Sequence, residues 1–519
     1  MRAFIFRAGI SQKEIMTLLI GFLLFSSLSC KHGNADNLER PNIVFIIGDD
    51  IGYADLGCYG SEIATPQLDR LAEEGARFRQ FYNMAKCNPT RSSLHTGMFY
   101  GDSSAHSLGK LMGDAGYRTL FVGKEHYDSW VPDHCYAAEA FDESLTFWAM
   151  NDYFIQKDGT VRNPYFLQGK QISPEQLDHN GNQWFQTEVM TDYAIRFLEK
   201  GQGEDNPFFL YLSYLNAHFP LQALEKDISK YRGKYMDGWD VIRARRFQRQ
   251  KDIGLVGDDW TLSPPSSNIN RFRGHPEGNE EIRERIPHYY PWSSLNDSMK
   301  RAFDLEMAVF AALVDNMDQN ISRLLNYLKE KGELENTIVM YMSDNGSCPY
   351  DSNRDFTIPP GKPNSFRTLN PKWANVGNTP FRYYKQYGHE GGANTHFIAW
   401  WPGKIPAGEL ITQTGHVVDI LPTLLELADY SGIDSVRVDG NSLLPALLGG
   451  TMEEHPYFIS GLDAFRMYRE DNYKLVRANY KDWQLYDLSS DPTETLNLAD
   501  SMPHKVKQLE DNYLKIMNK

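Results

Sequence analysis

Apolar runs that are typical of buried β-strands alternate along this chain with segments of helical periodicity. The strand runs cover residues 42–47, 117–123, 207–215 and 337–343. Between them, residues 65–78 have the period of an amphipathic helix that Thr65 caps and Gly75 ends, and residues 305–332 form a longer helical pattern. This alternation predicts an α/β fold with a large mixed, mostly parallel sheet sandwiched by helices.

Polar residues directly follow two of the predicted strands. Asp49 and Asp50 come after the first run, and Asp344 and Asn345 come after the last. Because ligands of parallel α/β sheets bind beyond the carboxyl ends of the strands, we expect these side chains to meet at one edge. Clustered carboxylates repel each other, and all-oxygen ligands select calcium or magnesium. The pairing predicts a metal site, although Asp, Asn and Gly after a strand also make ordinary turns.

Basic residues and histidines follow the other predicted strands. Lys124 and His126 lie two residues apart, so an extended backbone would point both side chains to one face. His218 follows residues 207–215, and Lys385 lies in a glycine-containing loop. Each residue alone is equally consistent with a solvated lysine or a structural histidine. Together with an arginine and a metal, they suit the binding of a tetrahedral oxyanion and the expulsion of an alcohol.

The beginning of the chain has the pattern of an export signal. Arg2, Arg7 and Lys13 precede an apolar stretch at residues 15–25, which is too short to span a bilayer comfortably. Small residues then precede Cys30. This predicts a signal peptide over residues 1–30, either of the lipoprotein type cleaved before Cys30 or of the plain secretory type.

The remainder of the chain divides into a large and a small part. Residues 38–450 are predicted to form the catalytic domain, and residues 451–519 a small C-terminal antiparallel sheet subdomain with a terminal helix, because four short strand patterns precede a helical one. The charged, proline-rich stretch around 226–300 is interpreted as an insertion across the surface. It either shapes a binding cleft or only packs against the rest of the fold. The net charge of −15 excludes general attraction to nucleic acid or anionic lipid, so an anionic substrate needs local positive charge.

The five cysteines match neither a zinc pattern nor a dense disulfide framework. One disulfide among Cys58, Cys135 and Cys348 stays open, with no pairing favoured. Cys87 stands apart because Pro89 and Arg91 follow it closely. Neither a buried structural cysteine nor a disulfide needs a rigid turn and a fixed positive charge beside it.

The segment Cys87-x-Pro89-x-Arg91, closed by Thr96 and Gly97, resembles the signature of type I sulfatases. The likeness extends over most of the chain, since seven family-like fragments occur in the family's order. They are PNIVFIIGDDIGYADLGCYG, TPQLDRLAEEGARF, GYRTLFVGKEHY, NAHFPL, SDNG, NTPFRYYKQYGHEGG and WQLYDLSSDPTETLNLAD. The resemblance implies an alkaline-phosphatase-like fold and a sulfuric ester hydrolase, similar to bacterial arylsulfatase-like members.

In this family a maturation enzyme oxidises the signature cysteine to formylglycine, which implies that the Cys87 segment is a recognition tag. The hydrated aldehyde is a gem-diol. One hydroxyl attacks sulfur and displaces the alcohol, and the other loses its proton as sulfate leaves and the aldehyde re-forms. A serine sulfate would instead need a second attack on a crowded anionic sulfur.

The resemblance also implies roles for single residues. Arg91 would hold the aldehyde hydrate, and Lys124 and Lys385 would bind sulfate. His126 would take a proton at the elimination step, and His218 would protonate the leaving oxygen. The implied ligands of one calcium ion, with magnesium as the alternative, are Asp49, Asp50, residue 87, Asp344 and Asn345.

The expected reaction is the release of inorganic sulfate from a sulfated carbohydrate. Export and a lipid anchor at Cys30 suit glycan degradation in the periplasm of a Gram-negative bacterium. Two alternatives stay open: a phosphodiester or phosphonate monoester hydrolase of the same superfamily, and an inactive glycan-binding lipoprotein. The sugar, the sulfated position, endo or exo action and the oligomeric state do not follow from these motifs.

Overall fold

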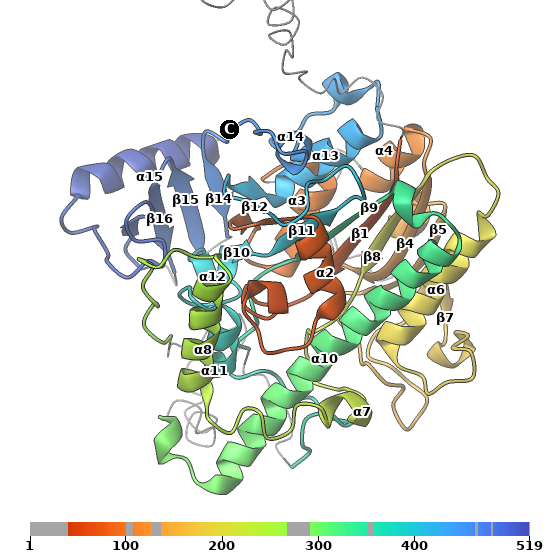
Figure 1. Ribbon diagram of the computed structural model, residues 1–519, viewed down its shortest axis with the longest axis horizontal. Helices are drawn as coiled ribbons and strands as arrows, with labels where there is room; N and C mark the ends of the chain where they lie inside the picture. The colour runs from red at the N-terminus through yellow and green to blue at the C-terminus, as the bar shows by residue number, and fades with distance from the viewer. Residues whose placement is uncertain are drawn as a thin grey trace, which may run out of the picture. The chain divides into compact units, whose positions relative to one another are not determined.

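In the computed structural model of the chain, strand β1 (Asn42–Gly48) lies inside a ten-stranded sheet and is buried along its whole length (Figure 1). It pairs in parallel with β8 (Phe208–Ser213) on one side and with β9 (Thr337–Ser343) on the other. Every side chain of these three strands is buried, which is why their apolar runs are unbroken rather than alternating. The predicted strands at these positions are confirmed.

The structure describes residues 40–99, 107–126, 136–266, 291–350, 357–461, 465–478 and 481–517. Residues from Pro41 onward form one compact unit, to which all that follows refers. The predicted signal peptide at residues 1–30, with Cys30, lies outside the described residues. In the described part of the chain, no helix combines the length and the apolar character needed to cross a membrane.

The large sheet is mixed and mostly parallel at its centre, which confirms the predicted fold class. Its order is β12-β2-β11-β9-β1-β8-β4-β5-β6-β7, and the strands from β9 to β5 run parallel. The other strands are β12 (Glu409–Ile411), β2 (Ala76–Phe78), β11 (Phe397–Trp400), β4 (Arg118–Glu125), β5 (Glu143–Trp148), β6 (Tyr165–Leu167) and β7 (Lys170–Ile172). A small unpredicted sheet joins β3 (Phe81–Tyr82), β10 (Asn394–Thr395) and β13 (Gly415–His416).

Helices cover both faces of the sheet (Figure 1). On one face, Val44 and Ile46 pack into the largest core cluster together with residues of α2 (Pro66–Glu74), α6 (Gln186–Lys200) and α10 (Asp297–Glu330). The alternate residue Phe45 points the other way and stacks on Tyr211, toward α3 (Cys87–Thr96), α4 (Leu108–Asp114) and α13 (Ile420–Leu427). Two packed faces explain the sandwich that the alternating pattern predicts.

Two helices differ from the sequence prediction for the same physical reason. Helix α10 begins at Asp297, eight residues before the predicted start, because the Asn296 side chain caps it by accepting from the Met299 amide at 3.0 Å. The first turns of this helix are polar, so the apolar periodicity does not reveal them. Helix α8 (Trp239–Asp252) lies in the stretch 226–300 and was not predicted. Its buried face carries Arg246, which pairs with Asp55 at 2.6 Å, so the apolar periodicity that reveals a helix is weak. Residues 267–290 of this stretch lie outside the described residues.

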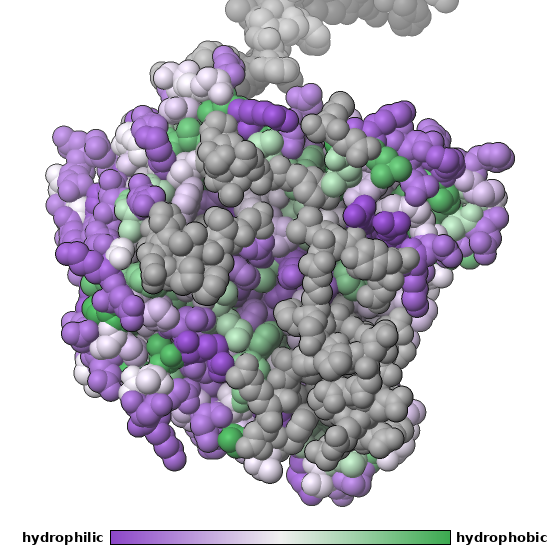
Figure 2. All heavy atoms as spheres, turned by 180° about the vertical axis from the view of Figure 1, so that it is seen from behind, coloured by the Kyte–Doolittle hydropathy of each residue, from purple (hydrophilic) through white to green (hydrophobic). Residues whose placement is uncertain are grey.

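The C-terminal part contains a separate four-stranded antiparallel sheet with a terminal helix, as predicted. Its elements are β14 (Phe458–Ser460), β15 (Arg466–Glu470), β16 (Tyr473–Arg477), β17 (Gln484–Asp487) and α15 (Pro503–Met517). The domain boundary at 450/451 stays a prediction. Seen from behind, the described surface is mainly hydrophilic with scattered apolar side chains (Figure 2).

A buried ion-pair cluster joins the small sheet to the remainder of the fold. The ammonium group of Lys474 lies 2.5 Å from Glu390 and 2.9 Å from Glu494, and all three side chains are fully buried. Replacing Lys474 with Met is expected to destabilise the protein by about 3–5 kcal/mol, because two buried carboxylates lose their cation. Urea unfolding followed by circular dichroism measures this.

Lys507→Met is the matched control, since Lys507 and Asp511 form an exposed pair on α15. Its unfolding midpoint should barely move, because exposed pairs contribute little. Equal midpoints for wild type and Lys474→Met would contradict the expected contribution of the cluster.

Candidate active site

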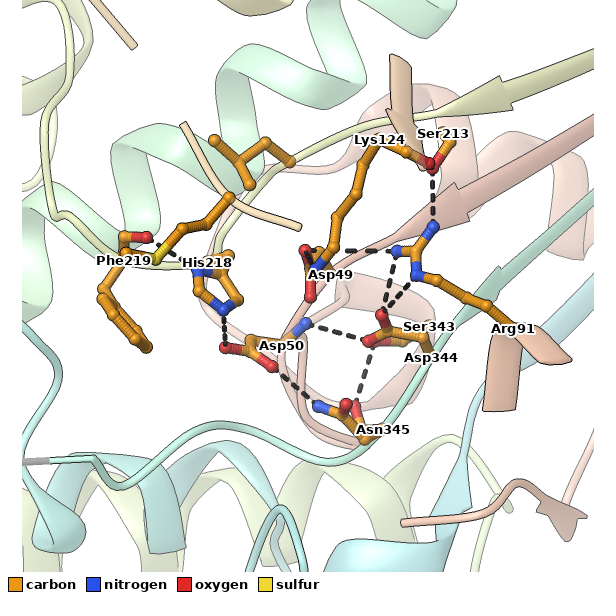
Figure 3. Close-up of polar contacts among 12 residues, drawn as sticks. Asp49, Asp50, Arg91, Lys124, Ser213, His218, Phe219, Ser343, Asp344 and Asn345 are labelled. Atoms are coloured by element: carbon orange, nitrogen blue, oxygen red, sulfur yellow. Dashed lines mark hydrogen bonds and ion pairs between the residues drawn. The ribbon is translucent and has the colours of Figure 1, made fainter. Parts of the chain in front are cut away.

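Strands β1 and β9 end side by side, in register from Asn42 opposite Thr337 to Gly48 opposite Ser343. Asp49 and Asp50 therefore emerge next to Asp344 and Asn345, as the strand-end rule led us to expect (Figure 3). The Asp50 amide donates to Oδ1 of Asp344 at 3.3 Å, and Nδ2 of Asn345 donates to Oδ1 of Asp50 at 2.8 Å. The structure brings the four residues together at one edge of the sheet.

Three oxygens of this group are buried without a hydrogen-bond donor in the part of the chain that the structure describes. They are Oδ1 of Asp49, Oδ2 of Asp50 and Oδ1 of Asn345. A buried polar atom without a partner is costly, and a cation satisfies it. Ligand atoms of Asp49, Asp344 and Cys87 also lie within 4.8 Å of one another. The residues therefore fit a divalent ion that prefers oxygen ligands, such as calcium or magnesium.

The pKa values of the carboxyl groups reflect this crowding. Burial, together with the negative charge of Asp49, raises the pKa of Asp344 to about 6, against the lowering effect of Arg91 and the two lysines. Burial also disfavours charge on Asp50, but Lys385, His218 and Lys124 hold its pKa well below the usual range. Additional positive charge would stabilise Asp344 in its ionised form.

Helix α3 begins at Cys87 and carries Arg91 one turn later, so both face the same edge of the sheet. Nε and Nη2 of Arg91 donate to Oδ2 of Asp344 at 3.0 and 2.8 Å, and Nη1 donates to Oγ of Ser213 at 2.6 Å. Burial alone would lower the pKa of Arg91, but Asp344 and Asp49 raise it, so the guanidinium stays charged. Arg91 thus fixes the end of β9 relative to residue 87.

The two predicted lysines point into the same cluster. Nζ of Lys124, on β4, lies 2.5 Å from Oδ2 of Asp49, and the ammonium group of Lys385 bonds to Oδ1 of Asp50. Both lysines are buried, with 1% of their surface exposed. Three cations, Arg91 included, therefore meet three carboxylates, and the protein charges balance.

His218 faces the cluster from the segment after β8. Its Nδ1 donates to the carbonyl oxygen of Phe219 at 2.6 Å, and its Nε2 faces the cluster, 3.6 Å from Oδ2 of Asp50 (Figure 3). Burial lowers the pKa of His218 to about 3; Asp50 opposes this effect, whereas Lys124 and Lys385 add to it. The imidazole is therefore neutral at pH 7 in this state.

His126 follows the end of β4, and its ring meets the Trp148 ring edge-on at 5.8 Å. Its Nδ1 is buried without a hydrogen-bond partner among the described residues. Burial and the positive charges of Lys124 and Arg91 hold its pKa well below the usual range. A neutral imidazole of this kind can accept a proton, but not donate one as an imidazolium.

Two serines of this site were missed in the sequence. Ser213 accepts from Arg91 and donates to the Lys124 carbonyl at 2.8 Å, and Ser343 accepts from the Ile51 amide at 3.1 Å. Both are the last residues of their strands, β8 and β9, so the strand-end rule would have identified them. Gly123 lets β4 approach Ser213, because a Cβ there would lie 1.9 Å from the Ser213 carbonyl oxygen.

The structure excludes one of the possible disulfide bonds, the one between Cys58 and Cys348. Cys58, Cys87 and Cys348 are buried free thiols, so Cys58 and Cys348 do not pair with each other. Cys135 lies outside the described residues.

Comparison with known proteins identifies similar chains along most of this sequence. A family model described as Sulfatase matches residues 41–430, and one described as N-sulphoglucosamine sulphohydrolase, C-terminal, matches residues 380–519. An uncharacterised sulfatase of Schizosaccharomyces pombe is 30% identical over 92% of this chain and 93% of its own length. The arylsulfatase of Klebsiella aerogenes is 29% identical over 77% of this chain and 89% of its own length.

One relative is named for a sugar substrate. The N-acetylglucosamine-6-O-sulfatase of Bacteroides thetaiotaomicron is 25% identical over 97% of this chain and 90% of its own length. Among solved structures, Ps i-CgsB in complex with k-i-k-neocarrahexaose matches with a TM-score of 0.64 at 22% identity, covering 92% of each chain. The phosphonate monoester hydrolase of Agrobacterium radiobacter matches with a TM-score of 0.56 at 17% identity, over 92% of this chain and 96% of that one. The shared fold therefore does not by itself choose between sulfate and phosphonate esters.

Proposed function

Because the chain belongs to the sulfatase family and is a sulfuric ester hydrolase, we propose that its substrate is a sulfated carbohydrate and that residue 87 acts as a formylglycine. The carbohydrate is suggested by the sugar named for the relative from Bacteroides thetaiotaomicron. Formylglycine would supply a gem-diol, with one hydroxyl to attack sulfur and a second to expel sulfate. The maturation enzyme that makes it is then a required partner.

The charge balance of the site is the observation that carries this proposal. Arg91, Lys124 and Lys385 neutralise Asp49, Asp50 and Asp344. A divalent cation held by the orphaned oxygens would therefore leave the site with two net positive charges, which favours binding of the negatively charged sulfate ester group. Asp49, Asp50, residue 87, Asp344 and Asn345 would hold the ion, for which we propose calcium, with magnesium as the alternative. The ion would orient residue 87 and polarise a sulfate oxygen.

The lysines and histidines have distinct proposed roles. Lys124 and Lys385 would exchange their carboxylate contacts for sulfate oxygens. His218 would protonate the leaving oxygen through Nε2, because its Nδ1–H is already donated to Phe219. Its depressed pKa means that it becomes an acid only when the negative charge of the substrate raises that pKa. His126, held neutral, would take the proton as sulfate leaves.

The cellular setting is a separate proposal that rests on the sequence alone. The N-terminal pattern supports export, and Cys30 supports a lipid anchor. The enzyme would then degrade sulfated glycans in the periplasm, or at a membrane surface, of a Gram-negative bacterium.

A panel of ester substrates tests the activity. Purified enzyme from a host that makes formylglycine is expected to release sulfate from at least one sulfated mono- or oligosaccharide, as measured by ion chromatography. The kcat/KM for 4-nitrophenyl sulfate should exceed that for 4-nitrophenyl phosphate and for a phenylphosphonate monoester by at least about 100-fold, a difference of about 2.7 kcal/mol in transition-state binding.

A higher kcat/KM for the phosphonate ester would favour the phosphonate monoester hydrolase instead. Binding of the sugars without release of sulfate, by protein that carries formylglycine, would favour the inactive glycan-binding protein. Comparison with a Lys124→Ala variant shows that any sulfate released comes from this site.

A further inference from the structure

The loop between β5 and β6 (residues 149–164, named here the β5–β6 loop) is fastened to the segment that carries His218. The hydroxyl of Tyr153 donates to the carbonyl oxygens of Leu215 at 2.9 Å and of His218 at 3.1 Å. The Tyr153 amide donates to the side chain of Gln222 at 2.9 Å, and Gln222 donates in turn to Asp152 at 3.1 Å. The loop therefore has a fixed position beside the proposed acid of the reaction.

The start of this loop lies next to His126, the other proposed proton-transfer residue. Trp148, which precedes the loop, packs edge-on against the His126 ring. Asn163, near the end of the loop, donates to the carbonyl oxygens of Trp148 at 3.1 Å and Met150 at 2.6 Å, which closes the loop on itself. The loop thus spans the side of the site on which His126 and His218 lie.

A row of aromatic rings leads from His218 to Arg162 of the β5–β6 loop. His218 stacks on Phe219 with 4.2 Å between ring centroids, and Phe219 lies on the far side of His218 from Arg91 (Figure 3). Phe219 contacts Phe366 at 5.8 Å, and the guanidinium carbon of Arg162 lies 4.5 Å above the Phe366 ring. Since His218 is proposed to protonate the leaving oxygen, this row lies along the leaving-group side.

Arg162 has hydrogen-bonding capacity to spare. One nitrogen, Nη2, makes a long contact of 3.4 Å with Oδ1 of Asp152, which Gln222 already satisfies in part. Its Nε is buried without a partner among the described residues. The side chain remains 24% exposed. A guanidinium has five donors and suits the planar or trigonal oxygens of carboxylate and sulfate groups.

We propose that Arg162 is a specificity-determining residue that binds a second anionic group of the substrate, a carboxylate or a further sulfate. The Phe366 ring holds its guanidinium in place, and the β5–β6 loop fixes its position relative to His218. The preferred substrate is then a sugar with two anionic groups rather than one whose only anionic group is the sulfate that is removed. This inference rests on the proposed function, because it needs a leaving group that is a sugar.

Kinetics on a matched panel test the inference. The panel contains a monosulfated hexosamine, the same sugar with a second sulfate, and the same monosulfated sugar linked to a uronic acid. Wild-type enzyme is expected to favour one of the doubly anionic sugars by about 10-fold or more in kcat/KM, the range of a charge-assisted hydrogen bond. Which sugar is favoured distinguishes sulfate from carboxylate. In Arg162→Ala the preference should fall to within about 2-fold, whereas Arg162→Lys should retain part of it because the charge remains.

Arg245→Ala is the matched control, because Arg245 also pairs with an aspartate, Asp237, at 2.6 Å but lies on the exposed face of α8. It should keep the full preference. An Arg162→Ala enzyme with undiminished preference would overturn the inference. Wild-type hydrolysis of the monosulfated sugar with no gain from a second anionic group would do the same and leave the proposed function intact. Hydrolysis of aryl sulfates alone would overturn both.

Discussion

A Cys87→Ala variant is expected to lose at least about 10⁴-fold in kcat/KM for sulfate esters, because residue 87 supplies the only nucleophile of the proposed reaction. The fold should tolerate the change, since alanine is smaller and favours the first turn of α3. Release of 4-nitrophenol from 4-nitrophenyl sulfate measures the activity, and thermal unfolding shows whether the variant is folded.

A control variant and a mass measurement test whether the loss of activity comes from residue 87. Cys58→Ala replaces another buried free thiol, outside the candidate site, and should keep wild-type activity. Trypsin cleaves after Lys86 and after Arg91 and so releases the peptide of residues 87–91. This peptide should be about 18 Da lighter than the peptide with the thiol, as expected for formylglycine. Full activity in Cys87→Ala, or in protein whose residue 87 is entirely an unmodified thiol, would contradict the proposed nucleophile.

Removal of the metal is expected to lower activity by about 100-fold or more, the scale of losing one preorganised electrostatic contact at the reacting group. Without the ion, Asp49 and Asp50 retain Lys124 and Lys385 as their partners, so the lysines are not available to the sulfate group. Dialysis against EDTA, followed by elemental analysis and kinetics, tests this. About one divalent ion per chain should be lost, and calcium should restore activity more fully than magnesium.

Stability gives a readout that does not depend on catalysis. An ion present at 100 times its Kd stabilises the folded state by about 2.7 kcal/mol, so Tm should rise on addition of calcium. Asn345→Ala removes one of the orphaned oxygens and should weaken this response. Asn320→Ala changes another buried asparagine, on α10, and should retain the full rise in Tm on addition of calcium. Metal-free protein with undiminished activity and an unchanged Tm would refute the metal site.

Much of the fold follows from local patterns. The strands at β1, β8 and β9 are predictable because both faces of each strand are buried, which requires continuous apolar residues. Helix α8 is not predictable in this way, because Arg246 and Gln250 occupy its buried face and find polar partners far away in sequence. The start of α10 was missed for a related reason, since its first turns depend on a cap rather than on apolar periodicity.

The sequence by itself determined the edge at which the site is built, because the side chains that follow parallel strands must gather at their carboxyl ends. It also determined the family, through fragments whose order is visible without coordinates. Only the tertiary structure decided which lysine neutralises which carboxylate, which nitrogen of His218 faces Asp50, and that the β5–β6 loop places Arg162 on the Phe366 ring. These features depend on contacts between residues far apart in sequence, and the free energy of a buried charge is set by the partners that the fold places around it.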